Sequence, residues 1–231
     1  MKADVTTYEY IFIFPDGKQK SFKIALNAVS LSINTCPTSP PQWTWLEHHQ
    51  CIPCSLSAKI HTFCPAALAI SSLVTTFQDT VSHKSCVVSC VSLDRTVTKE
   101  TTIQDGLSSI LGLLMATSGC PIMDFFRPLA RFHLPFSTVD ETIFRVFTTY
   151  MLRQYYRRSE GQNSDFELKD IRNQYALVKQ VNKGMLERIR DIAQFDADKN
   201  AIVTLDSLAQ ILEMEIDTNL ESLQYLFTTD I

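Results

Sequence analysis

Residues 7–26, TYEYIFIFPDGKQKSFKIAL, decide the class of fold. Apolar side chains alternate with more polar ones on both sides of the pair Asp16-Gly17, a dipeptide that favours a tight hairpin turn. This pattern predicts two antiparallel strands with one buried face. The apolar positions are Tyr8, Tyr10, Phe12 and Phe14 before the turn and Phe22, Ile24 and Leu26 after it.

Later segments extend this sheet and cover it. Ser85–Leu93 is rich in β-branched residues and alternates, with Cys86, Val88 and Cys90 on one side, and Arg95–Thr102 follows it. Both segments are most economically placed in the same antiparallel sheet. Apolar composition predicts a layer of helices between and after these strands. The expected helices are Pro65–Phe77, Gln104–Thr117 and Pro121–Phe132.

The last hundred residues have a helical pattern. Thr138-x-x-Glu141 is a capping box before a helix over Ile143–Arg158, and a polar break at residues 159–163 precedes a long helix over Asp165–Phe195. Apolar residues of the long helix recur every seven positions, with the polar Asn182 among them, and one or two final helices are expected over Thr204–Leu226.

We therefore expect an α+β protein: a small antiparallel sheet, a cysteine-bearing helical layer and a C-terminal helical hairpin. Residues 1–136 would form an α+β domain with the cysteine cluster, and residues 137–231 a helical region packed on it. The short polar break favours packing of the long helix against the Ile143–Arg158 helix of the same chain. This favours a monomer, and a homodimeric coiled coil is the alternative.

Composition limits the classes of partner. The 231-residue chain has 45% hydrophobic residues and a net charge of −4, and its isoelectric point is near 5.7. An acidic protein does not favour nucleic acid or an anionic membrane as its main partner. No signal-like or membrane-spanning stretch is found, and seven cysteines without an export signal indicate reduced thiols. We expect a cytoplasmic protein, with another protein as a conceivable partner.

Four cysteines carry most of the chemical information. Cys51, Cys54 and Cys64 form the pattern C-x2-C-x9-C-P, and Cys120 lies in Ser118-Gly119-Cys120-Pro121. Two thiols separated by two residues commonly bind one metal, and cysteine before proline is expected at a helix start. If the Pro65 and Gln104 helices pack antiparallel, the start of one lies near the end of the other. The sequence therefore predicts that the four thiols converge and bind zinc or an iron–sulfur cluster.

Two histidines are secondary candidates as metal ligands. His49 stands close to Cys51, and His133 lies in a stretch of cations and aromatic residues after Cys120. A regulatory or accessory metal-binding protein is the first functional hypothesis. The second is a thiol enzyme or redox switch that uses the Cys51–Cys54 pair or Cys120, with His133 as its base. The third is a metal-free interaction module.

Three segments together suggest a family. They are His49-Gln50-Cys51, Ala116-Thr117-Ser118-Gly119-Cys120-Pro121 and Ala130-Arg131-Phe132-His133-Leu134-Pro135-Phe136. Through them the chain resembles uncharacterised bacterial proteins of similar length that are classed as a domain of unknown function. The resemblance implies that these motifs belong to one fold, and it brings no activity, cofactor or catalytic residue.

Overall fold

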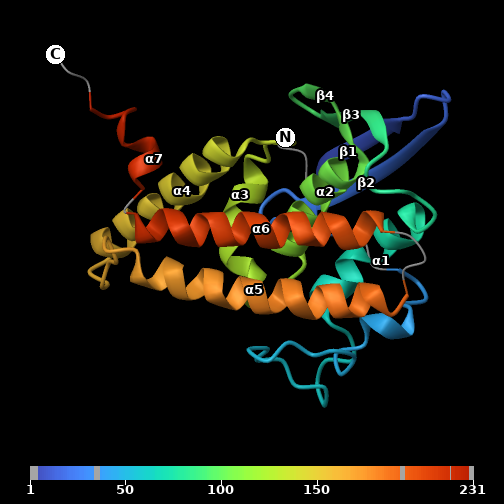
Figure 1. Cartoon of the computed structure of the whole chain (residues 1–231). Helices are drawn as coiled ribbons and strands as arrows, with labels where there is room; N and C mark the ends of the chain where they lie inside the picture. Colours follow the sequence, from blue (N-terminus) through green and yellow to red (C-terminus); the bar gives the residue numbers. More distant parts are fainter. Residues whose placement is uncertain (1–4, 34–36, 193–195, 219, 229–231) are drawn as a thin grey trace.

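The computed structural model describes residues 5–33, 37–192, 196–218 and 220–228. Four strands, two short 3-10 helices and seven α-helices make up this part of the chain (Figure 1). In chain order they are β1 Val5–Ile13, β2 Gln19–Asn27, η1 Gln42–Thr44, α1 Pro65–Phe77, β3 Ser85–Ser92, β4 Thr96–Thr102, α2 Ile103–Thr117, η2 Met123–Phe126, α3 Arg127–Arg131, α4 Val139–Ser159, α5 Lys169–Arg190, α6 Ala197–Asp217 and α7 Glu221–Gln224.

The four strands form one antiparallel sheet in the order β2-β1-β3-β4. Tyr10 pairs with Phe22 on β2 and with Cys90 on β3, so the two predicted pairs of strands join along β1. One face of the sheet is buried, as the alternation predicts. Its most buried side chains are Tyr8, Tyr10, Phe12, Ile24, Leu26, Cys86, Val88 and Cys90.

Helices α1 and α2 cover the buried face. The ring of Phe12 lies 4.8 Å from that of Phe77 on α1, and α2 contacts both β3 and β4. Close contact with α2 requires a glycine, because a Cβ atom on Gly106 would lie 2.6 Å from the ring of Phe12. Sheet and helices together confirm the α+β class.

The long seven-residue repeat lies on α5, which packs along α6 (Figure 1). The expected partner of α5 was the Ile143–Arg158 helix, now α4, and this expectation is wrong. Helix α6 begins at Ala197, seven residues before the expected start at Thr204, and is long enough to cover α5. Helix α5 ends at Arg190, and the expected end at Phe195 lies outside the described residues.

The C-terminal helical hairpin is therefore α5–α6, and it packs on the rest of the protein through α2. One hydrophobic core runs from Tyr8 on β1 to Leu223 on α7 and draws on both regions expected from the sequence. Helix α4 begins with the predicted capping box, in which Thr138 and Glu141 hydrogen bond to each other's backbone N–H groups. Among the described residues, no helix is both long and apolar enough to cross a lipid bilayer.

The close contact at Gly106 gives a test of helix–sheet packing. Gly106→Ala should lower the free energy of unfolding by about 1–3 kcal/mol, because the added methyl group overlaps the buried Phe12 ring. Gly112→Ala on the same helix is the matched control. Its Cβ would meet only Leu205, at 3.7 Å, so it should be neutral or stabilise by up to about 1 kcal/mol. Equal effects in urea unfolding would contradict the packing described here.

Candidate functional site

The segment between η1 and α1 carries three of the four candidate cysteines, and its two ends are held together. Residues Trp45 and Phe63 form an isolated antiparallel bridge. The Cys64 N–H donates to the Thr44 carbonyl at 2.8 Å, and the Leu46 N–H donates to the Thr62 carbonyl at 2.9 Å. The intervening residues therefore form a closed loop (Figure 1).

Cys64 and Pro65 occupy the predicted positions at a helix start. Cys64 is the N-cap residue of α1, and Pro65 is the first residue of that helix. Proline suits this position because its missing N–H has no intrahelical partner there. The fixed helix start holds the Cys64 sulfur in the core, where the residue is 7% exposed.

Cys51 and Cys54 lie in a tight turn, in which the Cys54 N–H donates to the Cys51 carbonyl at 2.9 Å. The turn rests on α5 at Gly184. A Cβ atom on that glycine would lie 2.7 Å from the Cys51 sulfur, so glycine is required for this close approach. Both cysteines are half-buried and their side chains turn toward the protein.

Cys120 approaches from the opposite side of the chain, just after α2. The Cys120 backbone N–H donates to the Ser118 hydroxyl at 3.2 Å, and Cys120 is 8% exposed. The expected helix start at Cys120 is wrong, because a turn precedes η2 and the helix over Pro121–Phe132 is replaced by η2 and α3. The turn nevertheless directs the N–H groups of Ile122 and Met123 at the Cys120 sulfur.

The structure brings all four predicted cysteines to the wall of one small cavity. The cavity has a volume of about 20 Å³, roughly the space for one water molecule. Val181, Met185 and Arg188 of α5 form the wall opposite the loop. Among the described residues, no three of the four sulfur atoms lie within 4.8 Å of one another, so the thiols surround the cavity without touching as a group.

Two of these thiols, Cys51 and Cys120, are kept protonated by their surroundings. Burial raises the pKa of Cys51 to about 11, and the neighbouring Cys64 adds to this effect more than Arg188 opposes it. Burial also raises the pKa of Cys120, although the Met123 and Ile122 N–H groups partly oppose the rise. The described cysteines are all free thiols. These are the properties of protected thiols rather than of an activated nucleophile, whose pKa is lowered.

Arg188 is the unexpected component of this site. Its side chain is 0% exposed, and its guanidinium donates to the carbonyls of Trp43, Trp45 and Leu46 at 2.7, 2.7 and 3.0 Å. Its Nε atom has no hydrogen-bond partner. No carboxylate forms an ion pair with it in the described part of the chain. A buried cation therefore faces four thiols.

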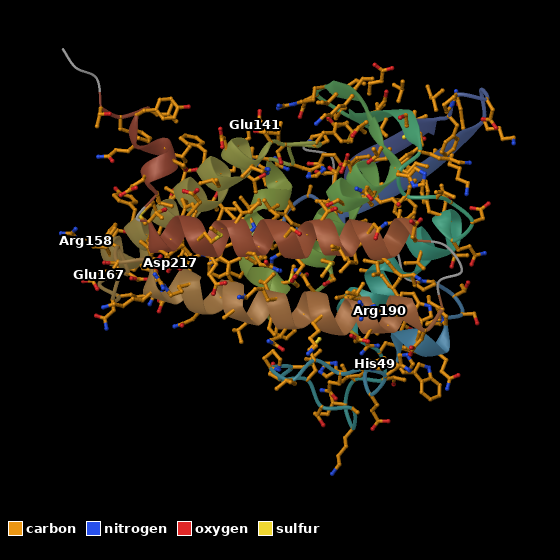
Figure 2. All side chains as sticks on the ribbon, in the orientation of Figure 1. His49, Glu141, Arg158, Glu167, Arg190 and Asp217 are labelled. Atoms are coloured by element: carbon orange, nitrogen blue, oxygen red, sulfur yellow. The ribbon has the colours of Figure 1, made fainter. Side chains whose placement is uncertain are left out.

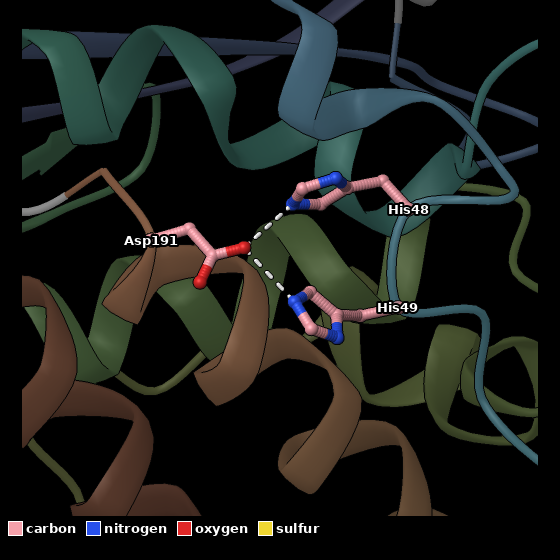
Figure 3. Close-up of side chains that lie close together, drawn as sticks. All are labelled: His48, His49 and Asp191. Atoms are coloured by element: carbon pink, nitrogen blue, oxygen red, sulfur yellow. Dashed lines mark hydrogen bonds and ion pairs between the residues drawn. The ribbon is translucent and has the colours of Figure 1, made fainter.

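His49 does not join the cysteine cavity. Its Nε2 atom hydrogen bonds to Asp191 Oδ2 at 2.9 Å, and His48 Nε2 lies 3.0 Å from the same oxygen (Figure 3). The group lies at the end of α5 that also carries Arg190 (Figure 2). It is the one set of three metal-ligating side chains whose ligand atoms approach within 4.8 Å in the described residues. The hydrogen bond from His49 lowers the pKa of the Asp191 carboxyl, as an exposed charge pair would.

His133 lies in a different part of the protein from Cys120. Its Nε2 atom is 2.5 Å from the Tyr10 hydroxyl, and its ring packs edge-on against Tyr8. Burial, together with the charge of Arg145, lowers the pKa of His133 to about 3, so the ring is neutral at pH 7. His133 and Cys120 line separate cavities, and the structure does not pair them as base and nucleophile.

Sequence reasoning missed Gly184 and Arg188. Both are unusual residues within the long helix. A glycine such as Gly184 costs a helix about 1 kcal/mol relative to alanine, and Arg188 places a charge next to the apolar repeat. Such interruptions signal a close approach or a buried polar contact. The sequence could have marked the two positions as unusual, but it could not have shown that they face the Cys51–Cys64 loop.

Comparison with known proteins assigns the chain to a family for which no activity is described. The family model described as Domain of unknown function (DUF6901) matches residues 7–228, which is nearly the whole chain. No curated protein and no solved structure matches the chain.

The raised pKa values predict slow thiol chemistry in the folded protein. In the reduced, metal-free protein, Cys51 should react with iodoacetamide with an apparent pKa near 11, because burial favours the neutral thiol. The fraction of reactive thiolate then grows as pH rises and is negligible at pH 7. Mass spectrometry of peptides alkylated at a series of pH values measures this. Rapid alkylation of Cys51 below pH 8 would contradict the description.

The separation of His133 from Cys120 predicts that His133→Ala leaves the alkylation rate of Cys120 unchanged. The same peptide measurement decides this. A rate that falls several-fold in the variant would restore the nucleophile–base pair expected from the sequence.

Proposed function

Because the chain belongs to the DUF6901 family, which supplies no activity, we propose a function from the chemistry of its own site. We propose that Cys51, Cys54, Cys64 and Cys120 together hold a metal centre through four thiolates. The protein would be a cytoplasmic metal-binding protein with a regulatory or accessory role. The reduced state of its described cysteines suits a reducing compartment.

The observation that carries the proposal is the pairing of four thiols with the buried cation of Arg188 around one cavity. A buried cation without an anionic partner is unfavourable. Four thiolates bring more negative charge than Zn²⁺ or a typical oxidised iron–sulfur core brings positive charge. The complex is therefore a net anion, and Arg188 would be its counter-ion. The protonated thiols alone provide no such charge.

The backbone around Cys120 supports the same proposal. N–H groups of Ile122 and Met123 point at its sulfur, and hydrogen bonds to cysteine sulfur stabilise metal-bound thiolates and tune cluster potentials. These hydrogen bonds would strengthen once metal binding displaces the proton from the Cys120 thiol.

Two kinds of metal centre share this ligand set. A cavity near the size of one water molecule suits a single zinc ion, whose four sulfurs lie about 2.3 Å from the metal. The four sulfurs are spaced more widely than one zinc ion requires, which suits a larger iron–sulfur cluster. Rotation of the half-buried Cys51 and Cys54 side chains would bring the sulfurs closer for zinc.

Metal analysis of protein purified without oxygen tests the proposal. We expect about one zinc per chain, or iron with acid-labile sulfide and a visible absorption band. Replacing any one of the four cysteines by alanine should abolish stoichiometric binding, since removing a ligand costs more than the 10–100-fold typical of a supporting residue. Absence of both metals, before and after reconstitution with zinc or with iron and sulfide, would refute the metal centre and leave a metal-free interaction module or a redox switch.

Matched controls separate this site from other thiols and from the surface histidines. Cys86→Ala and Cys90→Ala remove equally buried thiols from β3 and should retain the metal. The double variant His48→Ala and His49→Ala should also retain it, because their rings face Asp191. Loss of metal in the histidine variant alone would place the metal at the exposed group instead. Circular dichroism of each variant checks that it has folded.

A further inference from the structure

A second and much larger cavity lies on another side of α5. It has a volume of about 550 Å³, within the range of small-molecule binding sites, and it shares no lining residue with the cysteine cavity. It is a cleft partly open to solvent, and its walls come from β4, α2, the segment from η2 to α4, α5 and α6 (Figure 1).

Tyr175 and Asn182 of α5 stand in the wall of this cavity, and each residue is 3% exposed. The Tyr175 hydroxyl and Asn182 Nδ2 have no hydrogen-bond partner, but both atoms are buried within the wall and present no accessible surface to the cavity. Helix α5 therefore offers a ligand mainly apolar contacts.

The charged groups of the lining favour an anion. Lys99 and Arg145 form no ion pair among the described residues, and Arg145 donates only to the carbonyls of Leu129 and Phe132. The one acidic residue of the lining, Asp105, already accepts hydrogen bonds from Thr101 and Thr102. His133 is neutral at pH 7.

The remaining lining is mainly aliphatic and aromatic, with Phe126, Val178 and Leu212 among its members. We propose that this cavity binds a small organic acid with an apolar body, such as a fatty acid. The carboxylate would bind near Arg145, and the apolar body would fill the space beside α6. This proposal is independent of the metal centre.

Displacement of the fluorescent anion 1-anilinonaphthalene-8-sulfonate tests the proposal on the full chain. The dye should bind and brighten, dodecanoate should displace it, and dodecylamine should not, because the lining has excess positive charge. No binding of the dye or of dodecanoate, or equal displacement by the amine, would overturn the proposal.

A variant identifies the carboxylate contact. Arg145→Met should weaken dodecanoate by about tenfold. Dodecanoate binding unaffected by this substitution would refute the assigned contact.

A cavity-filling variant guards against dye binding to loosened protein. Gly112 lies in the wall with open space before it, since a Cβ there meets only Leu205 at 3.7 Å. Gly112→Phe should abolish dye and acid binding with an unchanged circular dichroism spectrum. Dye binding that persists in this folded variant would show that the dye and the acids bind elsewhere.

Discussion

The buried guanidinium of Arg188 is the interaction on which the cysteine site depends. It donates to three backbone carbonyls of residues 43–46, and buried carbonyls must be hydrogen-bonded. By satisfying them, α5 fixes the start of the loop that carries Cys51 and Cys54. The bridge between Trp45 and Phe63 then transmits this constraint to the loop's end and to Cys64.

Helix α5 is the wall that the two cavities have in common. Val181, Met185 and Arg188 face the cysteine cavity, and Tyr175, Val178 and Asn182 face the larger one. Helix α6 covers part of the remaining surface. The apolar repeat of α5 supplies packing. Natural proteins commonly break a local rule where they have a function, and the proposed metal centre would give the buried Arg188 such a role.

The two cavities differ in ways that suit different ligands. The small one is enclosed by sulfur and a single cation, and its thiols are protected by burial. The large one is mainly apolar, and its lining carries the cations of Lys99 and Arg145. Four sulfur ligands in the first would suit a soft metal, and apolar space with cations in the second would suit an organic acid.

The sequence by itself determined the local structure. Alternation around Asp16-Gly17 required a hairpin, Cys64-Pro65 required a helix start, and Thr138 with Glu141 required a capped helix, because each depends on neighbours within a few residues. The approach of Cys120 to the other three cysteines was expected only on the condition that the two helices pack together, and α1 and α2 do contact each other. The local signals act over distances that one stretch of chain can encode.

Tertiary structure alone decided which surfaces meet. A seven-residue repeat on α5 requires an apolar partner but does not specify which helix supplies it. Helices α4 and α6 are equally long, and the structure packs α5 along α6. The partners of the two histidines were likewise set by tertiary contacts. His49 hydrogen bonds to Asp191 and His133 to Tyr10, rather than to a cysteine of the site. Arg188 acquired its role only on burial. Desolvation and the choice of partner depend on distant segments, which no local pattern records.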